Sequence, residues 1–592
     1  MKKLLFTIIV LIFSSIAFSQ ALIDSDVLYD VTKKTHLRAV SQTSRSSLIV
    51  FLKSQLEMSS FLNELHNMPD VIAKPMHFMP AVAVVIPNDR TILNQIAAHD
   101  AVAQISLNKP ASEELEVSAQ AILLAPSAFS SDNNWWQAGY TGHLGVVGLI
   151  DSGIAVEHPG LANKALILDK EPQSDYLKYK NGVRTAHGTG VACIYAGSGS
   201  GSFPNDKGIA FGASTIVSGF ADDENFQTTT RTLDWMLTRA PVKPTVINYS
   251  FGNGSIGCPS CTDWSGLAKV VDYVVNHEKI LWVKSAGNQG LPKAPNQSTM
   301  SAPADNYNAL TVANMNLTVK ENGIARQTPD RRLHAIRYNS SRGPTLNGRR
   351  KPDITAPGND TRTCAPDNTV YNLTYTSAMD YRDGYRLMGG TSSAAPHVGG
   401  SVLLLQDAGI KNPMAIKALL INSADAWTDS GVPGPDDPSH VYQGGHFAVM
   451  GSEWNPTYGW GYLNMQRAFE QRLNLIEDKL TLNQTVKEYE VDLPVGGKVT
   501  LVHERRVGYN PDNTEWRLSH LSLVLIDAKT KQLIAEDDSI IDTVHQVANC
   551  LKQAGAKDCS NKTRTIHAIA RVTLMSSSID GSDDEPFAIS FG

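Results

Sequence analysis

The sequence lacks the features that mark a membrane protein, a nucleic-acid-binding protein or a small disulfide-rich scaffold. Beyond residue 19, no apolar run approaches the ~20 residues that a membrane-spanning helix needs. The net charge is −6, so no basic field attracts nucleic acid. Only six cysteines occur in 592 residues, too few to replace a hydrophobic core. Since 42% of the residues are hydrophobic, we expect an ordinary soluble protein of about three or four domains.

The few cysteines are expected to play local roles. Cys258 and Cys261 form a C-x-x-C motif, but no second pair accompanies them, so a local disulfide or two free thiols are favoured over a zinc site. Cys550 and Cys559 flank a short polar loop and are predicted to form a disulfide. Cys193 lies in an apolar helical run and is predicted to be a buried thiol.

The first 19 residues have the pattern of a signal peptide. Lys2 and Lys3 precede the apolar run 4–13, and small residues at Ala17 and Ser19 suit a cleavage site. The alternative is a membrane anchor, for which this run has about half the required length. We therefore expect residues 1–19 to be removed and the mature protein to be secreted, either to the periplasm or to the medium.

Residues 20–110 are expected to form a small α+β unit with its core at 47–108. Two strand-like runs, 48–52 and 81–86, enclose the helical apolar spacing of 55–65. A short helix at 91–98 and a strand at 102–107 complete a split βαβ pattern. Residues 111–132 have little regular pattern and are expected to be a linker.

Two further domains are expected after this linker. Residues 133–475 alternate strand-like and helix-like runs, which is typical of an α/β domain with a parallel sheet. Its predicted strands are 146–150, 209–213, 246–249, 280–283 and 310–313. Residues 480–592 instead contain short strand-like runs divided by turn residues, which indicates an all-β sandwich. The strands predicted there are 486–493, 498–502, 521–526, 566–572 and 586–591.

Three segments place a reactive side chain at a strand end or a helix start, where α/β sheets build their sites. Asp151 ends the strand 146–150, His187 is followed by small residues, and Ser392 lies among small residues at a helix start. Each has a structural alternative: a turn-forming aspartate, a packed helical histidine and a helix-capping serine.

Taken together, the three residues indicate a catalytic triad. Their order along the chain, Asp-His-Ser, is one of the known triad orders. A serine hydroxyl is a poor nucleophile and needs an imidazole as its base. The imidazole in turn needs a carboxylate that fixes its tautomer and stabilises its cation.

The sequence around these residues resembles the subtilisin-like serine proteases, the subtilase family. The resemblance lies in six segments in the family's order: VGLIDSGI at 147–154, HGTGVA at 187–192, VINYSFG at 246–252, SAGN at 285–288, NSSRGPTLNGRRKPDITAPG at 339–358 and GTSSAAPHVGG at 390–400. They cover most of residues 133–470. The resemblance implies an α/β fold: a subtilisin-like parallel sheet with helices on both faces, preceded by a small α+β propeptide and followed by the all-β sandwich.

The resemblance also implies roles for further residues. Asn288 matches the family's oxyanion-hole amide, although an asparagine in a turn is the structural alternative. Two segments match those that line the primary specificity pocket and pair with the substrate backbone: Ser250, Phe251 and Gly252, and Ser285, Ala286 and Gly287. The chain departs from the family at Gly190, where a second histidine is usual, and at Ser393, where methionine is common.

The implied activity is a serine endopeptidase that acts through an acyl-enzyme and is made as a self-processed zymogen. Its partners would be protein or peptide substrates and its own propeptide as inhibitor, and the self-cleavage would fall between Leu107 and Ser131. No cofactor is required for the chemistry. Structural calcium is compatible with the family, but no loop shows an Asp-rich ligand pattern that would place it. Two alternatives stay open: an inactive subtilase fold that binds proteins, and an esterase that uses the same triad.

Overall fold

The computed structural model describes most of the chain as two compact units, residues 1–112 and residues 113–592. The described residues are 22–23, 45–76, 80–87, 89–107, 114–124, 134–170, 185–199, 207–221, 226–252, 264–290, 298–321, 324–359, 361–365, 384–427, 454–494, 496–507, 516–549, 565–576 and 584–592. The predicted signal peptide, Cys258, Cys261, Cys550 and Cys559 lie outside them. In the part of the chain that is described, no helix has the length and apolar character needed to cross a membrane.

The first unit is the small α+β domain that the sequence predicts. Its five-stranded sheet has the order β1-β5-β2-β4-β3, and its helices are α2 (Met58–His66) and α3 (Arg90–Ala97). The strands are β1 (Leu22–Ile23), β2 (Arg45–Leu52), β3 (Ile72–Met76), β4 (Ala81–Pro87) and β5 (Val102–Leu107). Alternate residues of β4 are buried against both helices, which is the period-two pattern visible in the sequence.

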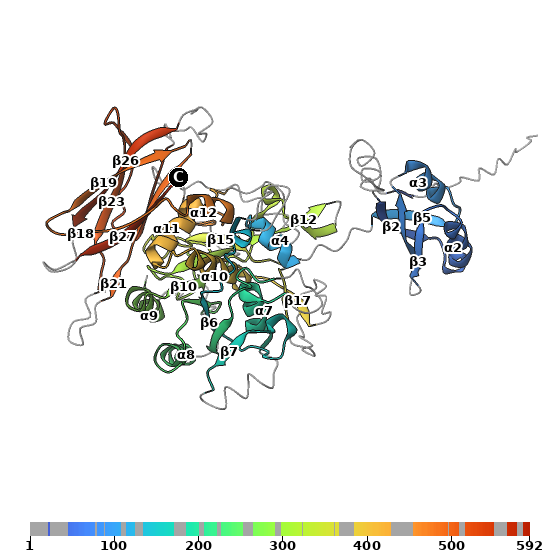
Figure 1. Ribbon diagram of the computed structural model, residues 1–592, viewed down its shortest axis with the longest axis horizontal. Helices are drawn as coiled ribbons and strands as arrows, with labels where there is room; N and C mark the ends of the chain where they lie inside the picture. Colours follow the sequence, from blue (N-terminus) through green and yellow to red (C-terminus); the bar gives the residue numbers. More distant parts are fainter. Residues whose placement is uncertain are drawn as a thin grey trace, which may run out of the picture. The chain divides into compact units, whose positions relative to one another are not determined.

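An eight-stranded sheet forms the centre of the second unit (Figure 1). Its order is β14-β11-β10-β9-β6-β8-β7, with β15 also paired to β11, and every pairing except that of β14 is parallel. The strands are β6 (Val146–Asp151), β7 (Ala165–Leu168), β8 (Thr215–Phe220), β9 (Val246–Tyr249), β10 (Leu281–Ser285), β11 (Leu310–Asn316), β14 (Ala335–Ile336) and β15 (Ile354–Pro357). Every residue of β9, β10 and β11 is buried, so both faces of the sheet are covered.

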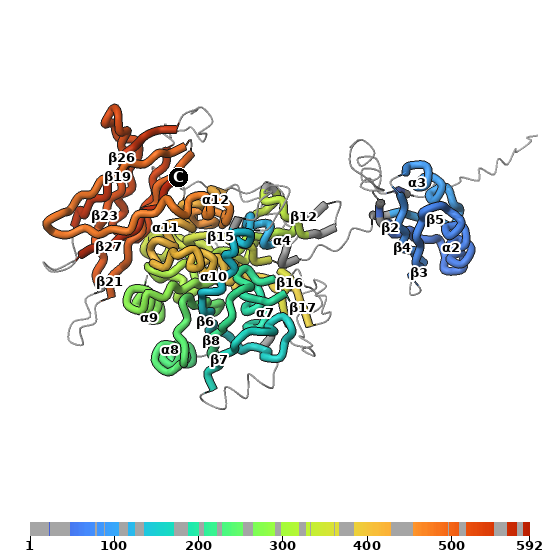
Figure 2. The backbone as a smooth tube through the Cα atoms, viewed as in Figure 1, coloured from blue at the N-terminus to red at the C-terminus, as the bar shows by residue number. Residues whose placement is uncertain are grey.

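The helices around this sheet bring distant segments together (Figure 2). α10 (Thr391–Asp407) packs on β9, β10 and β11 and against α7 (Thr185–Ala196). α8 (Phe226–Thr238) packs on β8, and α9 (Gly266–Tyr273) precedes β10. The expected α/β fold, with a mainly parallel sheet covered by helices, is therefore confirmed.

One predicted strand of this sheet is wrong. Residues 209–213 form a turn, and the strand β8 begins only at Thr215. The N–H groups of Ile209 and Ala210 donate to the carbonyls of Ile194 and Tyr195 at the end of α7, at 3.0 and 2.9 Å. The apolar run is buried as predicted, but it caps a helix rather than joining the sheet.

The segment expected to be a linker is also partly wrong, because it contains α4 (Glu114–Ala121). Val117, Ala119 and Ile122 are buried, and Ala119 and Ile122 belong to the hydrophobic core around the central sheet. The Oγ of Ser118 lies 2.8 Å from Nε2 of His397 in α10. The sequence 114–124 was not recognised as a helix, although it forms one that packs on the α/β body.

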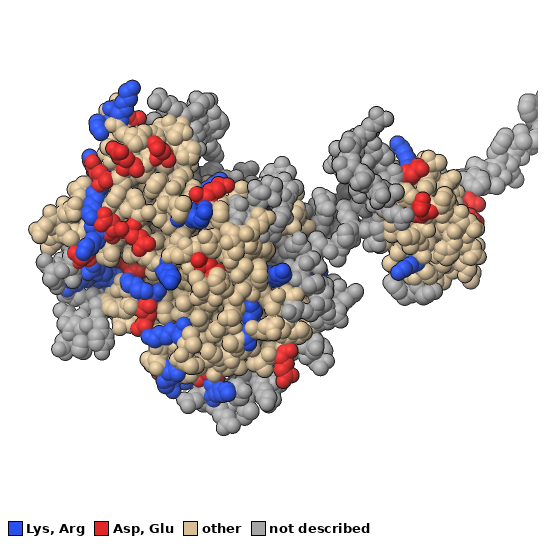
Figure 3. Space-filling model, in the orientation of Figure 1, with Lys and Arg blue, Asp and Glu red and all other residues tan. Residues whose placement is uncertain are grey.

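The C-terminal all-β sandwich is confirmed, as two four-stranded antiparallel sheets of order β18-β27-β20-β25 and β19-β26-β23-β24. The first contains β18 (Leu475–Leu480), β20 (Lys498–His503), β25 (Val544–Ala548) and β27 (Glu585–Phe591). The second contains β19 (Val486–Leu493), β23 (His520–Asp527), β24 (Leu533–Asp537) and β26 (Ile566–Ser576). Apolar side chains of both sheets share one core. On the face drawn in Figure 3, side chains of both charge signs are interspersed over these strands.

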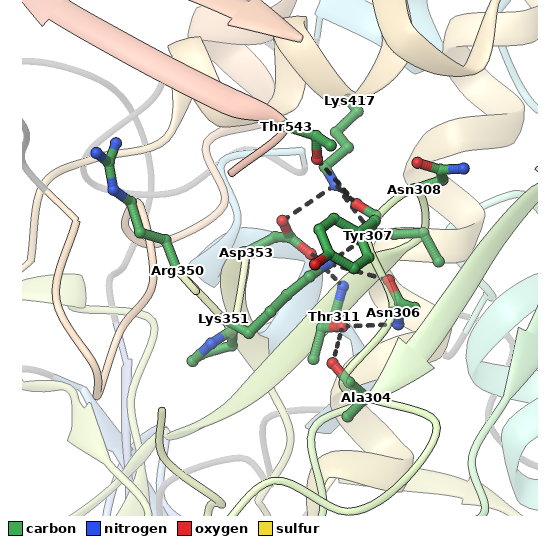
Figure 4. A network of polar contacts seen from close by, with 12 residues as sticks. Ala304, Asn306, Tyr307, Asn308, Thr311, Arg350, Lys351, Asp353, Lys417 and Thr543 are labelled. Atoms are coloured by element: carbon green, nitrogen blue, oxygen red, sulfur yellow. Dashed lines mark hydrogen bonds and ion pairs between the residues drawn. The ribbon is translucent and has the colours of Figure 1, made fainter. Parts of the chain in front are cut away.

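The sandwich and the peptidase body are parts of the same compact unit. α11 (Pro413–Ser423) packs on β20 and β27 (Figure 1). Met414, Trp460 and Val544 belong to one apolar cluster at this boundary. Polar contacts cross it as well (Figure 4). Thr543 donates to the carbonyl of Tyr307 at 3.1 Å, while Lys417 donates to that same carbonyl at 3.0 Å.

The prediction that Cys193 is a free buried thiol is wrong, because Cys193 forms a disulfide with Cys364 of β16 (Thr361–Cys364). Their Cα atoms are 5.8 Å apart, a usual separation for a disulfide. The partners are 171 residues apart in sequence, so only the tertiary structure brings them together.

Candidate active site

The three residues predicted as a triad come from three elements whose ends meet. Asp151 is the last residue of β6, His187 is the third residue of α7, and Ser392 is the second residue of α10. The first element ends at the carboxyl edge of the parallel sheet, where α/β folds place their sites. His187 and Ser392 both line one pocket of about 410 Å³.

Asp151 and His187 form a hydrogen-bonded pair. The Oδ1 of Asp151 lies 2.7 Å from Nδ1 of His187 and also accepts the N–H of Ser152 at 2.7 Å. Asp151 is fully buried, whereas about a third of the His187 side chain is exposed. A buried carboxylate on Nδ1 fixes the tautomer in which Nε2 is free to take a proton, and it stabilises the cation that then forms.

Gly188 allows this pair to form. A Cβ at position 188 would lie 2.2 Å from the carbonyl oxygen of Gly153 and 3.1 Å from Oδ1 of Asp151. Any larger residue would therefore push α7 away from the aspartate.

Ser392 sits at the start of α10 in a conformation that its neighbours impose. Gly390 caps the helix with φ +98°, a left-handed value that favours glycine. The Oγ of Ser392 donates to the carbonyl of Ser250 at 3.1 Å. Among the hydrogen bonds of the described residues none joins Ser392 to His187, so the hydroxyl must rotate toward the imidazole before it can react. Catalytic hydrogen bonds often tighten only when substrate binds.

Asn288 is held by its acceptor oxygen. Its Oδ1 accepts both the N–H and the Oγ of Thr391, each at 2.9 Å. The Oγ of Thr391 also accepts the N–H of Gly287 at 3.2 Å. With the oxygen engaged, the amide NH₂ is the group that faces away from Thr391, and Asn288 lines the same pocket as Ser392.

The segments predicted to bind substrate meet at this pocket, with one exception. Its lining contains Ser250, Phe251 and Gly252, and Ser285 and Gly287. The ring of Phe251 packs edge-on against His187, with centroids 5.4 Å apart. Ala286 is fully buried, and its N–H and carbonyl bond to Val312 and Ser301, at 2.9 and 3.1 Å. Ala286 therefore lies behind the pocket lining, and its backbone groups are bonded within the fold.

Several pocket residues were missed from the sequence. They are Ser152, Lys284, Gln289, Ser301 and Thr391. Thr391 immediately precedes Ser392, and its role as the holder of Asn288 depends on a contact 103 positions away in sequence. Lys284 directly follows the predicted strand 280–283, and no periodic signal marks it.

Comparison with known proteins agrees with this geometry. The profile of the Peptidase_S8 family, described as the subtilase family, matches residues 142–461. The membrane-bound transcription factor site-1 protease of Mus musculus is 28% identical over 299 residues, which are 49% of this chain and 24% of that protein. Bacillopeptidase F of Bacillus subtilis is 26% identical over 411 residues, 65% of this chain and 25% of that protein. The chain thus spans about a quarter of the length of these relatives.

A solved structure that is similar over most of this chain is that of fervidolysin from Fervidobacterium pennivorans, a keratinolytic enzyme related to subtilisin. It has a TM-score of 0.40 and 14% identity, and the match covers 89% of this chain and 86% of that one. Because the family profile matches more than half of the sequence, the chain belongs to the subtilase family of subtilisin-like serine proteases.

Proposed function

We propose that this protein is a secreted endopeptidase that hydrolyses peptide bonds with Asp151, His187 and Ser392. The observation that carries this proposal is the 2.7 Å contact between Asp151 and His187 beside the pocket that holds Ser392. His187 takes the hydroxyl proton as Ser392 attacks the peptide carbonyl, and then gives that proton to the leaving amine. In the second half of the reaction, His187 takes a proton from a water molecule that attacks the acyl-enzyme. It then gives that proton to the Oγ of Ser392 as the acyl group leaves.

Asn288 is proposed to stabilise the negative oxygen of the tetrahedral intermediate. Its NH₂ and the backbone N–H of Ser392 are the donors. The N–H of the second residue of a helix has no acceptor within its own helix, so that of Ser392 is available for this role. Ser250 to Gly252, together with Ser285 and Gly287, would hold the substrate beside Ser392.

The small first unit is proposed to be an inhibitory propeptide that the enzyme removes. The cut was expected between Leu107 and Ser131. Since residues 117–124 contribute buried side chains to the peptidase unit, we place it between Leu107 and Glu114. The mature enzyme would then keep α4 and its contact with His397.

A comparison of wild type with Ser392→Ala tests both proposals. Protein is refolded from purified, denatured material, which removes host proteases. Wild type should hydrolyse casein and release a mature chain that begins between residues 108 and 114, as read by N-terminal sequencing. Ser392→Ala should do neither, with turnover reduced by ~10⁶-fold.

The same assay separates the alternative activities. Hydrolysis of a simple ester without hydrolysis of casein would favour an esterase. A folded wild-type protein that hydrolyses neither would favour a binding module. Clipping of Ser392→Ala at the wild-type site and rate would exclude self-processing by this serine.

A further inference from the structure

Lys284 is a buried cation beneath the pocket, and the proposed mechanism does not use it. It lies in β10, one position before Ser285, and its side chain has no exposed surface. Its Nζ donates to the carbonyl and the Oγ of Ser285, the latter at 3.0 Å. Even so, Lys284 is part of the pocket lining, so its charge sits directly below the surface that a substrate would contact.

Lys284 has little negative charge to balance it. Among the ion pairs of the described residues, none involves Lys284. Asp305 is the acidic group that acts on it, but the Asp305 oxygens accept from the N–H and Oγ of Ser265, at 2.7 and 2.9 Å. Burial lowers the pKa of Lys284 to about 7, and Asp305 offsets only part of this shift. The ring of Tyr249, 5.9 Å away, is the other feature near the ammonium.

The wall between this ammonium and the pocket is thin at Gly252. A Cβ at position 252 would lie 3.4 Å from Nζ of Lys284 and 3.0 Å from Cβ of Ser301. The neighbouring lining is polar, since the Oγ of Ser301 donates to Oε1 of Gln289 at 2.6 Å. This end of the pocket therefore offers a positive charge and hydroxyl groups rather than an apolar floor.

We propose that the pocket selects an acidic side chain, glutamate or aspartate, on the acyl side of the cleaved bond, and that Lys284 is the residue that selects it. This inference rests on the proposed endopeptidase function. A substrate carboxylate would supply the counter-charge that the fold leaves out. An apolar side chain would leave the buried cation unpaired, and a basic one would be repelled. The site thus discriminates by charge as well as by size.

Four peptides test this, identical except for the residue on the acyl side of the bond: glutamate, glutamine, leucine or lysine. Glutamine has the shape of glutamate without its charge, so the Glu:Gln ratio of kcat/KM isolates the electrostatic contribution. We expect wild type to favour glutamate by at least ~10-fold over glutamine, and to cleave the lysine peptide least well. In Lys284→Met, which keeps most of the length of the side chain but removes its charge, the ratio should fall to about one.

Lys243→Met is the matched control, because Lys243 is exposed and pairs with Glu278 at the surface. It should keep the wild-type ratio. Circular dichroism and cleavage of the leucine peptide report whether Lys284→Met is folded, and Lys284→Gln serves as a second variant. A wild-type enzyme that does not distinguish glutamate from glutamine overturns the inference without any variant. An unchanged ratio in a folded Lys284→Met also overturns it. If wild type cleaves none of the four peptides, nor casein, the endopeptidase function itself is overturned.

Discussion

Ser250 donates its hydroxyl to the carbonyl of Ser392, 3.0 Å away, and Pro396 is the reason that this carbonyl is free. In a regular helix the N–H of residue 396 would bond to the carbonyl of residue 392, but proline has no N–H. The return bond runs from the Oγ of Ser392 to the carbonyl of Ser250 at 3.1 Å. The proposed nucleophile is thus fastened to the pocket wall by a pair of reciprocal hydrogen bonds.

Ser250→Ala should leave the Ser392 carbonyl buried without a partner and lower the free energy of unfolding by about 1–3 kcal/mol. Urea unfolding in a Ser392→Ala background measures this without self-digestion. Adding Pro396→Ala returns an N–H that can reach the carbonyl, so the double change should recover part of the loss. If Pro396→Ala only adds to the loss, the proline does not explain this contact.

Asn288→Ala should reduce kcat by about 10²–10³-fold with little change in KM, because one donor to the oxyanion is lost. The range is that of the corresponding asparagine in subtilisin, carried over by analogy. Thr391→Val removes one of the two groups that hold the Asn288 oxygen and should lower kcat by a smaller factor. Steady-state kinetics on one peptide check both. An Asn288→Ala enzyme with more than half of wild-type kcat would remove Asn288 from the mechanism.

The C-terminal sandwich should be required for a stable peptidase, contrary to what its lack of family motifs suggests. Arg350 makes buried ion pairs with Asp537 and Asp542 of the sandwich, at 2.5 and 3.1 Å. The strands β20, β25 and β27 also cover apolar residues of α11. A chain that ends near Asp478 should therefore be unfolded or aggregated by circular dichroism and light scattering. A folded, active chain of that length would show that the sandwich is separable.

Asp537→Ala tests the same contact at a single residue. Burial acts to raise the pKa of Asp537, but hydrogen bonds from His545 and Arg350 outweigh it and hold the pKa below its usual range. Loss of this carboxylate leaves the buried Arg350 with Asp542 as its remaining ion-pair partner, so we expect the free energy of unfolding to fall by an amount toward the lower end of about 3–5 kcal/mol. The surface substitution Asp584→Ala, which breaks the exposed pair with Lys479, should lower the free energy of unfolding far less, because solvent screens that pair.

Acid should weaken the fold in a pH range set by a buried histidine. Burial lowers the pKa of His397 to about 4, although its bond to the Ser393 carbonyl acts the other way. The unfolded chain has a histidine pKa near 6.5, so it binds protons first as the pH falls. The stabilisation is complete above pH 6.5 and is lost progressively between 6.5 and 4. In His397→Gln, the free energy of unfolding should fall less steeply with decreasing pH in this range. His334, whose pKa burial also lowers to about 4, contributes to the same pH dependence and remains in this variant. A slope unchanged by His397→Gln would assign it to other groups such as His334.

The features that could be predicted are those that a short stretch of consecutive residues indicates without reference to the rest of the chain. The strands 146–150 and 81–86 could be predicted because each is a short, continuous apolar run. The triad of Asp151, His187 and Ser392 was predicted in a similar way, because each residue lies in a short motif and the motifs occur in a known order.

What could not be predicted depends on partners far apart in the chain. Nothing near Cys193 indicates Cys364, and nothing near Lys284 shows that Gly252 leaves its ammonium close to a pocket. The helix α4 was missed because its apolar residues become buried only through contact with β16 and with Leu317, which are far away in the sequence. Tertiary contact, rather than local preference, decided each of these cases.

The Cys193–Cys364 bond makes a ring of the chain between its two partners, 171 positions apart. Ser250, Lys284 and Asn288 lie inside this ring, whereas Asp151 and Ser392 lie on the tails that leave it. The closed ring lowers the conformational entropy of the unfolded chain. In a chain-entropy estimate this raises the free energy of unfolding by about 5 kcal/mol. Ser250, Lys284 and Asn288 would therefore be kept on one loop even when the molecule opens, and Asp151 and the proposed nucleophile Ser392 would each have to return to it from a different end of the chain.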